Sequence, residues 1–92
     1  MIKKNMGSKK IEFKISAPNA NKVAIAGDFN DWRPDVLAAK KDKKGLWKAS
    51  TTIPAGTYEY KFVIDGSWVT DPICSKKRAN TYGSENSILE VR

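Results

Sequence analysis

Histidine is absent from this chain of 92 residues, and cysteine occurs only once. Without histidine, no Ser-His or Cys-His pair is available to activate a nucleophile. Metal sites built from histidine or from several cysteines are excluded for the same reason, so we expect no metal and no cofactor. The lone Cys74 excludes a disulfide within the chain, which is typical of a reducing compartment, and we expect a cytoplasmic protein.

Long apolar runs are missing as well. The N-terminal segment MIKKNMGSKK is charged and lacks an apolar stretch, so we expect no signal peptide, and no run approaches the length needed to span a membrane. We predict a flexible basic tail at residues 1–10 and one domain at residues 11–92. A hydrophobic content of 40% with 29% charged residues is ordinary for a globular domain.

The net charge is +7, from 17 basic and 10 acidic residues. Such a charge permits an anionic partner, including nucleic acid. However, the lysines occur in short groups within predicted tails and turns, and the largest group is the basic run Lys76-Lys77-Arg78. We interpret this distribution as a solubilising surface and expect neither a nucleic-acid partner nor a membrane partner.

A hairpin is predicted at the centre of the chain. Aromatic and aliphatic residues alternate with other residues over 58–64, which indicates a half-buried strand, and a second strand follows at 67–70. Asp65-Gly66 lies between them and is typical of a type I′ turn, in which both central residues have positive φ. A two-residue turn sets four opposed pairs: Ile64 with Ser67, Val63 with Trp68, Phe62 with Val69, and Lys61 with Thr70.

The register assigns the hairpin residues to two faces. Tyr60, Phe62, Ile64 and Val69 share the face that we expect to join the core. Lys61, Val63, Trp68 and Thr70 share the opposite face, which we expect to be exposed. A tryptophan there, with a lysine diagonally across the hairpin, calls for a functional explanation.

Further strands are expected at residues 11–15, 22–26, 46–53 and 87–91. Residues 35–40 fit either one helical turn or a short strand, residues 41–45 fit a turn, and a loop is expected after Asp71-Pro72 through Tyr82. About seven short strands without an amphipathic helix predict an all-β, immunoglobulin-like sandwich, with a small barrel of the OB type as the alternative. The predicted core contains Phe13, Ile15, Val23, Ile25, Trp47, Ile53, Tyr60, Phe62, Ile64 and Val69.

Five aspartates are candidates for a glycosidase carboxylate pair: Asp28, Asp31, Asp35, Asp65 and Asp71. Their neighbours place most of them in turns or at strand exits, and a sandwich of this size has little room for a deep cleft. We therefore interpret them as turn residues and expect a protein that is not an enzyme.

Two tryptophans have no place in the predicted core. Trp32 lies in a turn and Trp68 lies opposite the core face, so either could form a second packing cluster or a binding surface. An indole stacks on the apolar face of a pyranose, while lysine and asparagine bind sugar hydroxyls. Stacked bases of a single-stranded nucleic acid would use the same side chains, so chemistry alone leaves both ligands open.

Four segments resemble carbohydrate-binding module family 48, the glycogen- and starch-binding domain of AMP-activated kinase β subunits and of branching and debranching enzymes. They are GDFNDW at 27–32, YEYKFVIDGSW at 58–68, Asp71-Pro72, and NSIL at 86–89. The resemblance covers residues 11–92 in order. It implies an early-set immunoglobulin-like sandwich that binds α-1,4-glucan without hydrolysing it.

The resemblance also implies site residues. Trp32 and Trp68 correspond to the family's stacking tryptophans, Lys61 to its sugar-binding lysine, and Asn86 to its asparagine near the last strand. Tyr82 and Ser84 replace a leucine and a threonine that are usual there, and we expect both to contact sugar. The expected ligand is an α-glucan polysaccharide or maltooligosaccharide.

The alternative function is a structural domain that docks onto an amylolytic enzyme or a kinase subunit and binds sugar weakly or not at all. The presence of both tryptophans together with Lys61 and Asn86 favours the glucan-binding function, because a packing domain does not require that set.

Overall fold

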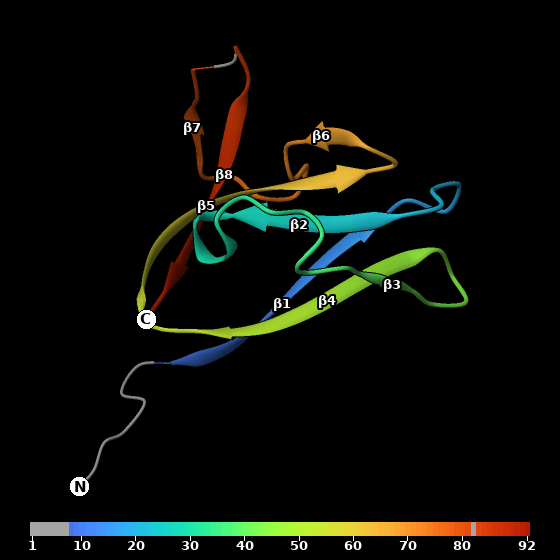
Figure 1. The fold of residues 1–92 in the computed structure, drawn as a ribbon, viewed down its shortest axis with the longest axis horizontal. Coiled ribbons are helices and arrows are strands. Elements are labelled where there is room, and N and C mark those ends of the chain that lie inside the picture. Colours follow the sequence, from blue (N-terminus) through green and yellow to red (C-terminus); the bar gives the residue numbers. More distant parts are fainter. Residues whose placement is uncertain (1–7, 82) are drawn as a thin grey trace, which may run out of the picture.

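The computed structural model describes residues 8–81 and 83–92, and in it two antiparallel sheets form the immunoglobulin-like sandwich predicted from the sequence (Figure 1). Most of the predicted N-terminal tail, and the candidate site residue Tyr82, lie outside the described residues. The first strand begins at Lys9, two residues before the predicted start.

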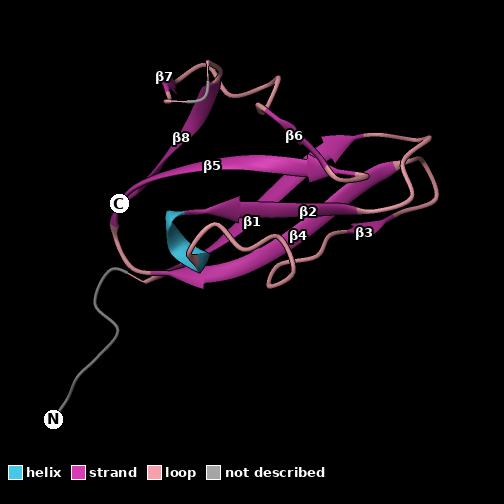
Figure 2. Cartoon of the chain, turned by 45° about the horizontal axis from the view of Figure 1, so that its top comes forward, coloured by secondary structure: helices cyan, strands magenta, loops and turns pink. Residues whose placement is uncertain are grey.

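The described residues form eight strands and one short 3₁₀ helix, η1, which is cyan in Figure 2. The strands are β1 (Lys9–Ser16), β2 (Val23–Gly27), β3 (Lys40–Lys41), β4 (Leu46–Ile53), β5 (Gly56–Ile64), β6 (Ser67–Val69), β7 (Lys77–Ala79) and β8 (Glu85–Val91). The first sheet has the order β1-β4-β3. The second has the order β2-β5-β8-β7, with β6 paired to β5, and η1 (Asp28–Asn30) follows β2.

The central hairpin has the predicted register. Phe62 pairs with Val69, Val63 with Trp68, and Ile64 with Ser67. Asp65 and Gly66 have φ values of 49° and 86°, as a type I′ turn requires. The fourth predicted pair is not formed, because β6 ends at Val69 and the Thr70 hydroxyl instead donates a hydrogen bond to the Glu85 carbonyl at 2.7 Å.

The segment that the sequence left undecided starts in a turn at residues 34–36, and the residues after it link the two sheets. The Ile25 amide donates to the Leu37 carbonyl at 3.0 Å, and the Ala39 amide donates to the Val23 carbonyl at 2.8 Å. The next two residues form β3 on the opposite sheet, where Lys41 pairs with Trp47. The predicted turn therefore begins after Lys41. Of the two alternatives for residues 35–40, the short strand holds only for Lys40, with an isolated bridge at Ala38, whereas Asp35 and Val36 lie in a turn.

The prediction of a loop after Asp71 is wrong at β7. Arg78 pairs with Asn86 and Lys77 with Ser87, so the basic run becomes an edge strand against β8. All three β7 residues are exposed, so the strand has no apolar alternation that sequence analysis could detect.

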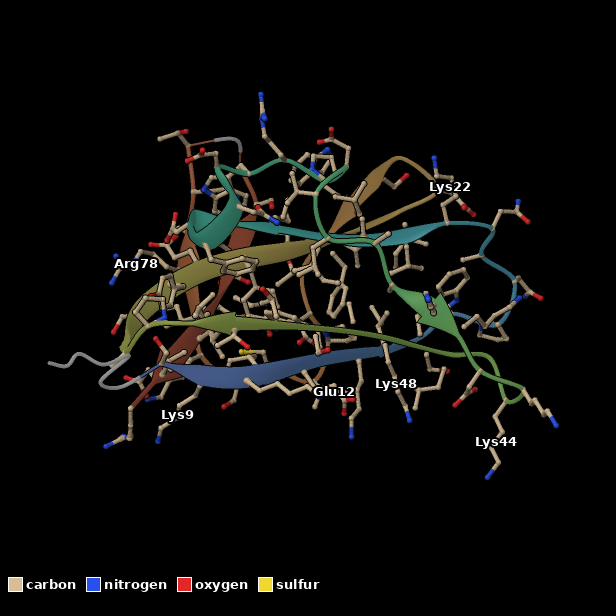
Figure 3. The ribbon with its side chains drawn as sticks, turned by 60° about the horizontal axis from the view of Figure 1, so that its bottom comes forward. Lys9, Glu12, Lys22, Lys44, Lys48 and Arg78 are labelled. Carbon is tan, nitrogen blue, oxygen red and sulfur yellow. The ribbon has the colours of Figure 1, made fainter. Side chains whose placement is uncertain are left out.

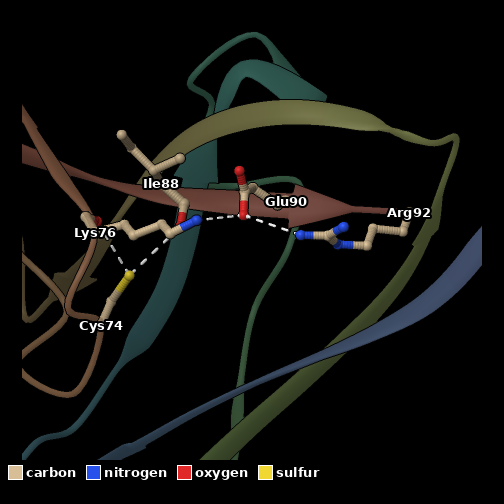
Figure 4. A network of polar contacts seen from close by, with 5 residues as sticks. All are labelled: Cys74, Lys76, Ile88, Glu90 and Arg92. Carbon is tan, nitrogen blue, oxygen red and sulfur yellow. Dashed lines mark hydrogen bonds and ion pairs between the residues drawn. The ribbon is translucent and has the colours of Figure 1, made fainter.

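Polar contacts near the C-terminus hold the chain that enters β7 against β8 (Figure 4). Lys76 forms an ion pair with Glu90, and the hydrogen bond from Lys76, together with its positive charge, lowers the pKa of the Glu90 carboxyl. The thiol of Cys74 donates to the Ile88 carbonyl at 3.5 Å. These contacts fasten the base of the β7–β8 hairpin, which projects from the sandwich (Figure 1).

A buried hydrophobic cluster lies between the sheets. It contains seven of the ten predicted core residues, namely Phe13, Ile15, Val23, Ile25, Trp47, Tyr60 and Phe62. Ile53 is also buried, and Ile64 and Val69 are partly buried against the cluster. Phe62 is only 1% exposed, which confirms the inward face predicted for the hairpin.

Asp71 has a structural role beyond the strand exit that the sequence indicated. It is buried, and its Oδ2 accepts a hydrogen bond of 2.6 Å from the Tyr60 hydroxyl. Burial and this hydrogen bond both raise the pKa of the Tyr60 phenol.

No helix in the described part of the chain is long and apolar enough to cross a membrane.

Candidate functional site

The outer face of the second sheet carries an open groove of about 1010 Å³. Its lining comes from the loop after η1, from β5 and β6, and from the β7–β8 hairpin. Five of the six predicted site residues line it: Trp32, Lys61, Trp68, Ser84 and Asn86. Residues that lie more than fifty positions apart in the chain therefore meet on one surface.

Two tryptophans form the aromatic part of the groove. The ring centroids of Trp32 and Trp68 lie 6.4 Å apart, and the ring planes are inclined by 36°. Trp68 is 48% exposed, whereas Trp32 is partly buried. Asp31 and Trp32 both have left-handed backbones, with φ values of 55° and 59°. Such backbones are uncommon for residues other than glycine, and strained positions of this kind gather at functional sites.

Asp28 holds Trp32 in place, a role that sequence analysis did not assign to it. Its Oδ1 accepts a hydrogen bond of 3.0 Å from Trp32 Nε1, and its Oδ2 accepts one of 2.8 Å from the Glu59 amide. The start of the loop is fixed as well, because Asn30 Oδ1 accepts from the Gly27 amide and Asn30 Nδ2 donates to the Ile25 carbonyl, both at 3.0 Å. The indole is thus tied through one carboxylate to β5.

Gly27 is needed where the loop leaves β2. A Cβ atom there would meet the Glu59 carbonyl at 2.5 Å and the ring of Phe29 at 2.7 Å. Only glycine lets β2 and the loop lie this close to β5. The glycine of the GDFNDW segment therefore brings Asp28 within reach of the Glu59 amide.

Lys61 differs from its predicted exposure. The side chain lies on the outer face as the register requires, but the residue is only 8% exposed. Its ammonium donates to Ser84 Oγ on the hairpin that overhangs β5. The neighbouring outward residue Val63 is only 9% exposed as well, so this face is covered more than the sequence indicated. A lysine can occupy such a buried position because the aliphatic part of its side chain is apolar, while its ammonium group reaches polar partners.

Amide and carboxylate groups form the polar wall of the groove. Glu59 accepts hydrogen bonds of 3.1 Å from Asn86 Nδ2 at one carboxylate oxygen and from Arg78 Nη1 at the other. Asn80 Nδ2 donates to Asn86 Oδ1 at 3.0 Å. Glu59, Arg78 and Asn80 were not among the predicted site residues. Only Glu59 had a signal in the sequence, because it alternates with Tyr58 and Tyr60 and so shares the outward face of Lys61.

The charges that line the groove cancel. Asp28 and Glu59 are negative, and Lys61 and Arg78 are positive. Both oxygens of each carboxylate accept hydrogen bonds, so these acids position other groups. A surface of exposed indole, amides and hydroxyls with no excess charge suits an uncharged polyol better than a polyanion.

A two-sheet sandwich with such a groove on one outer face is typical of a carbohydrate-binding module. Residues 10–92 match the family described as the glycogen recognition site of AMP-activated protein kinase, and the chain belongs to this family of non-catalytic modules. The family and the absence of a catalytic role agree with the expectations drawn from the sequence.

Similar proteins carry the module within longer chains. A 1,4-alpha-glucan branching enzyme of Salinibacter ruber is 32% identical over 84 residues, which cover 84% of this chain and 14% of the enzyme. Protein PTST homolog 2 of Arabidopsis thaliana, a chloroplastic protein, is 34% identical over 75 residues, or 80% of this chain and 14% of that protein. The 5'-AMP-activated protein kinase subunit beta-2 of mouse is 31% identical over 70 residues, or 76% of this chain and 25% of the subunit.

A solved structure supports the fold. The maltogenic amylase from S. marinus matches with a TM-score of 0.76 and 22% identity, over 90% of this chain and 13% of the amylase. This chain therefore corresponds to a small part of each of these proteins.

Proposed function

We propose that this chain is a non-catalytic module that binds α-1,4-glucan, such as glycogen or starch, in the groove between the tryptophan pair and the β7–β8 hairpin. The observation that carries the proposal is that the ring centroids of Trp32 and Trp68 lie 6.4 Å apart in a groove whose remaining lining is mostly polar. An indole presents an apolar face to the C–H face of a pyranose, and amides and ammonium groups bind its hydroxyls.

The inclination of the two rings favours an α-linked chain. The two indole planes are inclined by 36° to one another, so they are not coplanar. An α-1,4-glucan curves from one glucosyl unit to the next, whereas a β-1,4-glucan forms a flat ribbon that needs coplanar platforms. The tryptophan pair thus matches the ligand that the family description names.

The polar wall is arranged before a ligand arrives. Asn86 is held by Glu59 and Asn80, and Lys61 is held by Ser84. Groups whose orientation is already fixed lose less conformational entropy on binding. In the proposed complex Lys61 and Asn86 bind sugar hydroxyls, Ser84 supports Lys61, and Tyr82 is a further sugar contact as its place in the family motif implies.

The proposed cellular role of the module is to attach itself weakly to a glucan polymer. A module that occupies a few glucosyl units holds itself, or an enzyme joined to it, at the surface of the polysaccharide. A cytoplasmic location remains the prediction made from the lone cysteine, although similar proteins include chloroplastic ones.

Sedimentation with glycogen tests the proposal. The chain is mixed with glycogen particles and centrifuged, alone or with an excess of maltoheptaose or of cellohexaose. We expect the chain to sediment with glycogen, maltoheptaose to release it, and cellohexaose to leave it bound. A chain that stays in the supernatant, or that both oligosaccharides release equally, would contradict an α-glucan site.

A further inference from the structure

Arg78 was not among the predicted site residues, yet it lines the groove from the outermost strand of the second sheet. On this edge strand, β7, it pairs with Asn86 of β8. Residues directly opposite one another share one face of a sheet, so both side chains lie on the face that carries the groove. The Arg78 side chain projects outward at the left of the molecule in Figure 3. Arg78 thus belongs to the same surface as the predicted site residues, one strand beyond Asn86.

Glu59 holds one end of the Arg78 guanidinium group. Its Oε2 accepts a hydrogen bond of 3.1 Å from Arg78 Nη1, and its Oε1 accepts one of 3.1 Å from Asn86 Nδ2. The Glu59 side chain is 23% exposed, whereas that of Arg78 is 66% exposed. A largely buried carboxylate therefore orients two groove side chains that come from neighbouring strands.

Most of the hydrogen-bonding capacity of Arg78 is unused. A guanidinium group has five N–H donors and no acceptor. Within the described part of the chain only Nη1 has a hydrogen-bond partner, so the donors on Nη2 and Nε can reach a ligand. The planar group is already oriented by Glu59, and it therefore loses less conformational freedom when it binds.

Folding gives only a weak reason for the pair between Arg78 and Glu59. Exposed ion pairs contribute little to stability, because water and salt screen their charges. All three residues of β7 are exposed, and Arg78 covers no part of the hydrophobic cluster between the sheets. Its place in the groove therefore calls for a role in binding.

We propose that Arg78 is a further sugar-binding residue that extends the glucan site onto β7, and that Glu59 is the residue that positions it. This inference rests on the proposed function, because it adds a contact within the same groove. Arg78 donates hydrogen bonds from Nη2 and Nε to hydroxyl oxygens of the glucan, while Nη1 stays bound to Glu59.

An uncharged ligand suits Arg78 better than an anion does. The Glu59 carboxylate lies 3.1 Å from Nη1, so it offsets the positive charge of the guanidinium group and would repel a phosphate or carboxylate placed beside it. Sugar hydroxyls accept hydrogen bonds from the same N–H groups without that repulsion. The ligand of Arg78 is therefore the neutral glucan.

The first test follows side-chain N–H signals by NMR while maltoheptaose is added to the 92-residue chain. The Nε–H signal of Arg78 and the indole N–H signal of Trp68 are recorded together. We expect both to shift with the same dissociation constant. If the Trp68 signal shifts and the Arg78 signal does not, this inference fails and the proposed function stands. If neither signal shifts, both fail.

The second test is titration calorimetry of Arg78→Gln with maltoheptaose. Glutamine is shorter and lacks the planar fork, so binding should weaken about fivefold. Lys77→Gln is the matched control, because it removes the same charge from the same exposed strand while its side chain lies on the opposite face. The control should change binding less than twofold. Parent-like binding by Arg78→Gln, or equal weakening by both variants, would overturn the inference.

The third test examines the positioning role of Glu59. Glutamine has a single acceptor oxygen, so in Glu59→Gln either Arg78 or Asn86 loses its partner. If Glu59 acts partly through Arg78, the double variant Glu59→Gln/Arg78→Gln should lose less affinity for maltoheptaose than the product of the two single losses. Single losses that simply multiply would show that the two residues act independently, and would contradict the positioning role.

Discussion

Asp28 accepts a hydrogen bond from the indole nitrogen of Trp32 at 3.0 Å, and this contact sets the position of one half of the aromatic platform. The other oxygen of the same carboxylate accepts from the Glu59 amide at 2.8 Å. Trp32 is therefore connected to β5, the strand that also carries Lys61. The geometry of the groove depends on a short acidic side chain that need not contact the ligand itself.

Replacing Asp28 by asparagine should weaken glucan binding while the fold is retained. The amide group has only one acceptor oxygen, so its nitrogen would face either the indole N–H or the Glu59 amide, and one hydrogen bond would be lost. We expect maltoheptaose to bind about tenfold more weakly, which corresponds to ~1.4 kcal/mol. Titration calorimetry measures this change.

The control for that variant is Asp31→Asn. Asp31 has a left-handed backbone that asparagine also tolerates, and it lies three residues away on the same loop. Its replacement should leave binding within twofold. If both variants bind like the parent, Asp28 does not position the platform.

Truncation of Phe62 should strongly destabilise the domain. Its side chain is 1% exposed between the two sheets, and large-to-small replacement of a buried aromatic residue costs roughly 3–5 kcal/mol. We expect Phe62→Ala to lower the free energy of unfolding by about this amount, as followed by urea denaturation. A transition at the urea concentration of the parent would show that the inward face is assigned wrongly.

Alkaline pH should destabilise the protein through Tyr60. Burial and the hydrogen bond to Asp71 raise the pKa of this phenol above its ordinary value of 10.0. Above pH ~10 the unfolded chain releases the Tyr60 proton while the folded chain keeps it, so the free energy of unfolding falls as pH rises from there. Below that pH both states hold the proton, and Tyr60 causes no pH dependence.

Tyr60→Phe tests this linkage. The variant should be less stable by about 2 kcal/mol at neutral pH, because a buried carboxylate loses a hydrogen bond, and its stability should fall less steeply above pH ~10. Tyr58→Phe is the matched control, since its hydroxyl donates to the Pro54 carbonyl in an exposed position. An unchanged alkaline slope in Tyr60→Phe would contradict the assignment.

Glucan binding should be nearly independent of salt. The two acids and two bases that line the groove cancel, and a neutral ligand releases no counterions. Between 50 and 200 mM salt we expect the dissociation constant for maltoheptaose to change less than twofold. A steep decrease in affinity would indicate that an anionic ligand is the true occupant of the groove.

Residues whose pattern reflects burial were predictable from the sequence. The alternation over residues 58–64 and the Asp65-Gly66 turn defined the central hairpin. Side chains that alternate between apolar and other residues with a period of two are typical of a strand, and an Asp-Gly pair is typical of a turn that needs positive φ. The core face followed from that register. The family motifs then pointed to Trp32, Trp68 and Asn86, all of which line the groove.

The remaining features depend on contacts between distant segments. The edge strand β7 consists of exposed residues that are held by backbone pairing, so no apolar pattern marks it. Lys61 is buried because the hairpin at Ser84 lies over it, which its own strand does not reveal. The role of Asp28 requires that the loop after β2 meet β5, and within the sequence it looks like any turn aspartate.

Calorimetric titration of maltoheptaose into the parent chain and into Trp32→Ala and Trp68→Ala tests the central claim most directly. The parent should bind with a dissociation constant between micromolar and millimolar, or about −8 to −4 kcal/mol. Loss of one anchoring aromatic typically costs ~2 kcal/mol, so each variant should bind about thirtyfold more weakly, with little change in thermal unfolding. Trp47→Ala, which truncates a buried tryptophan, should instead destabilise the fold. Parent-like affinity in both Trp32→Ala and Trp68→Ala would contradict glucan binding at the tryptophan pair and would favour the docking function.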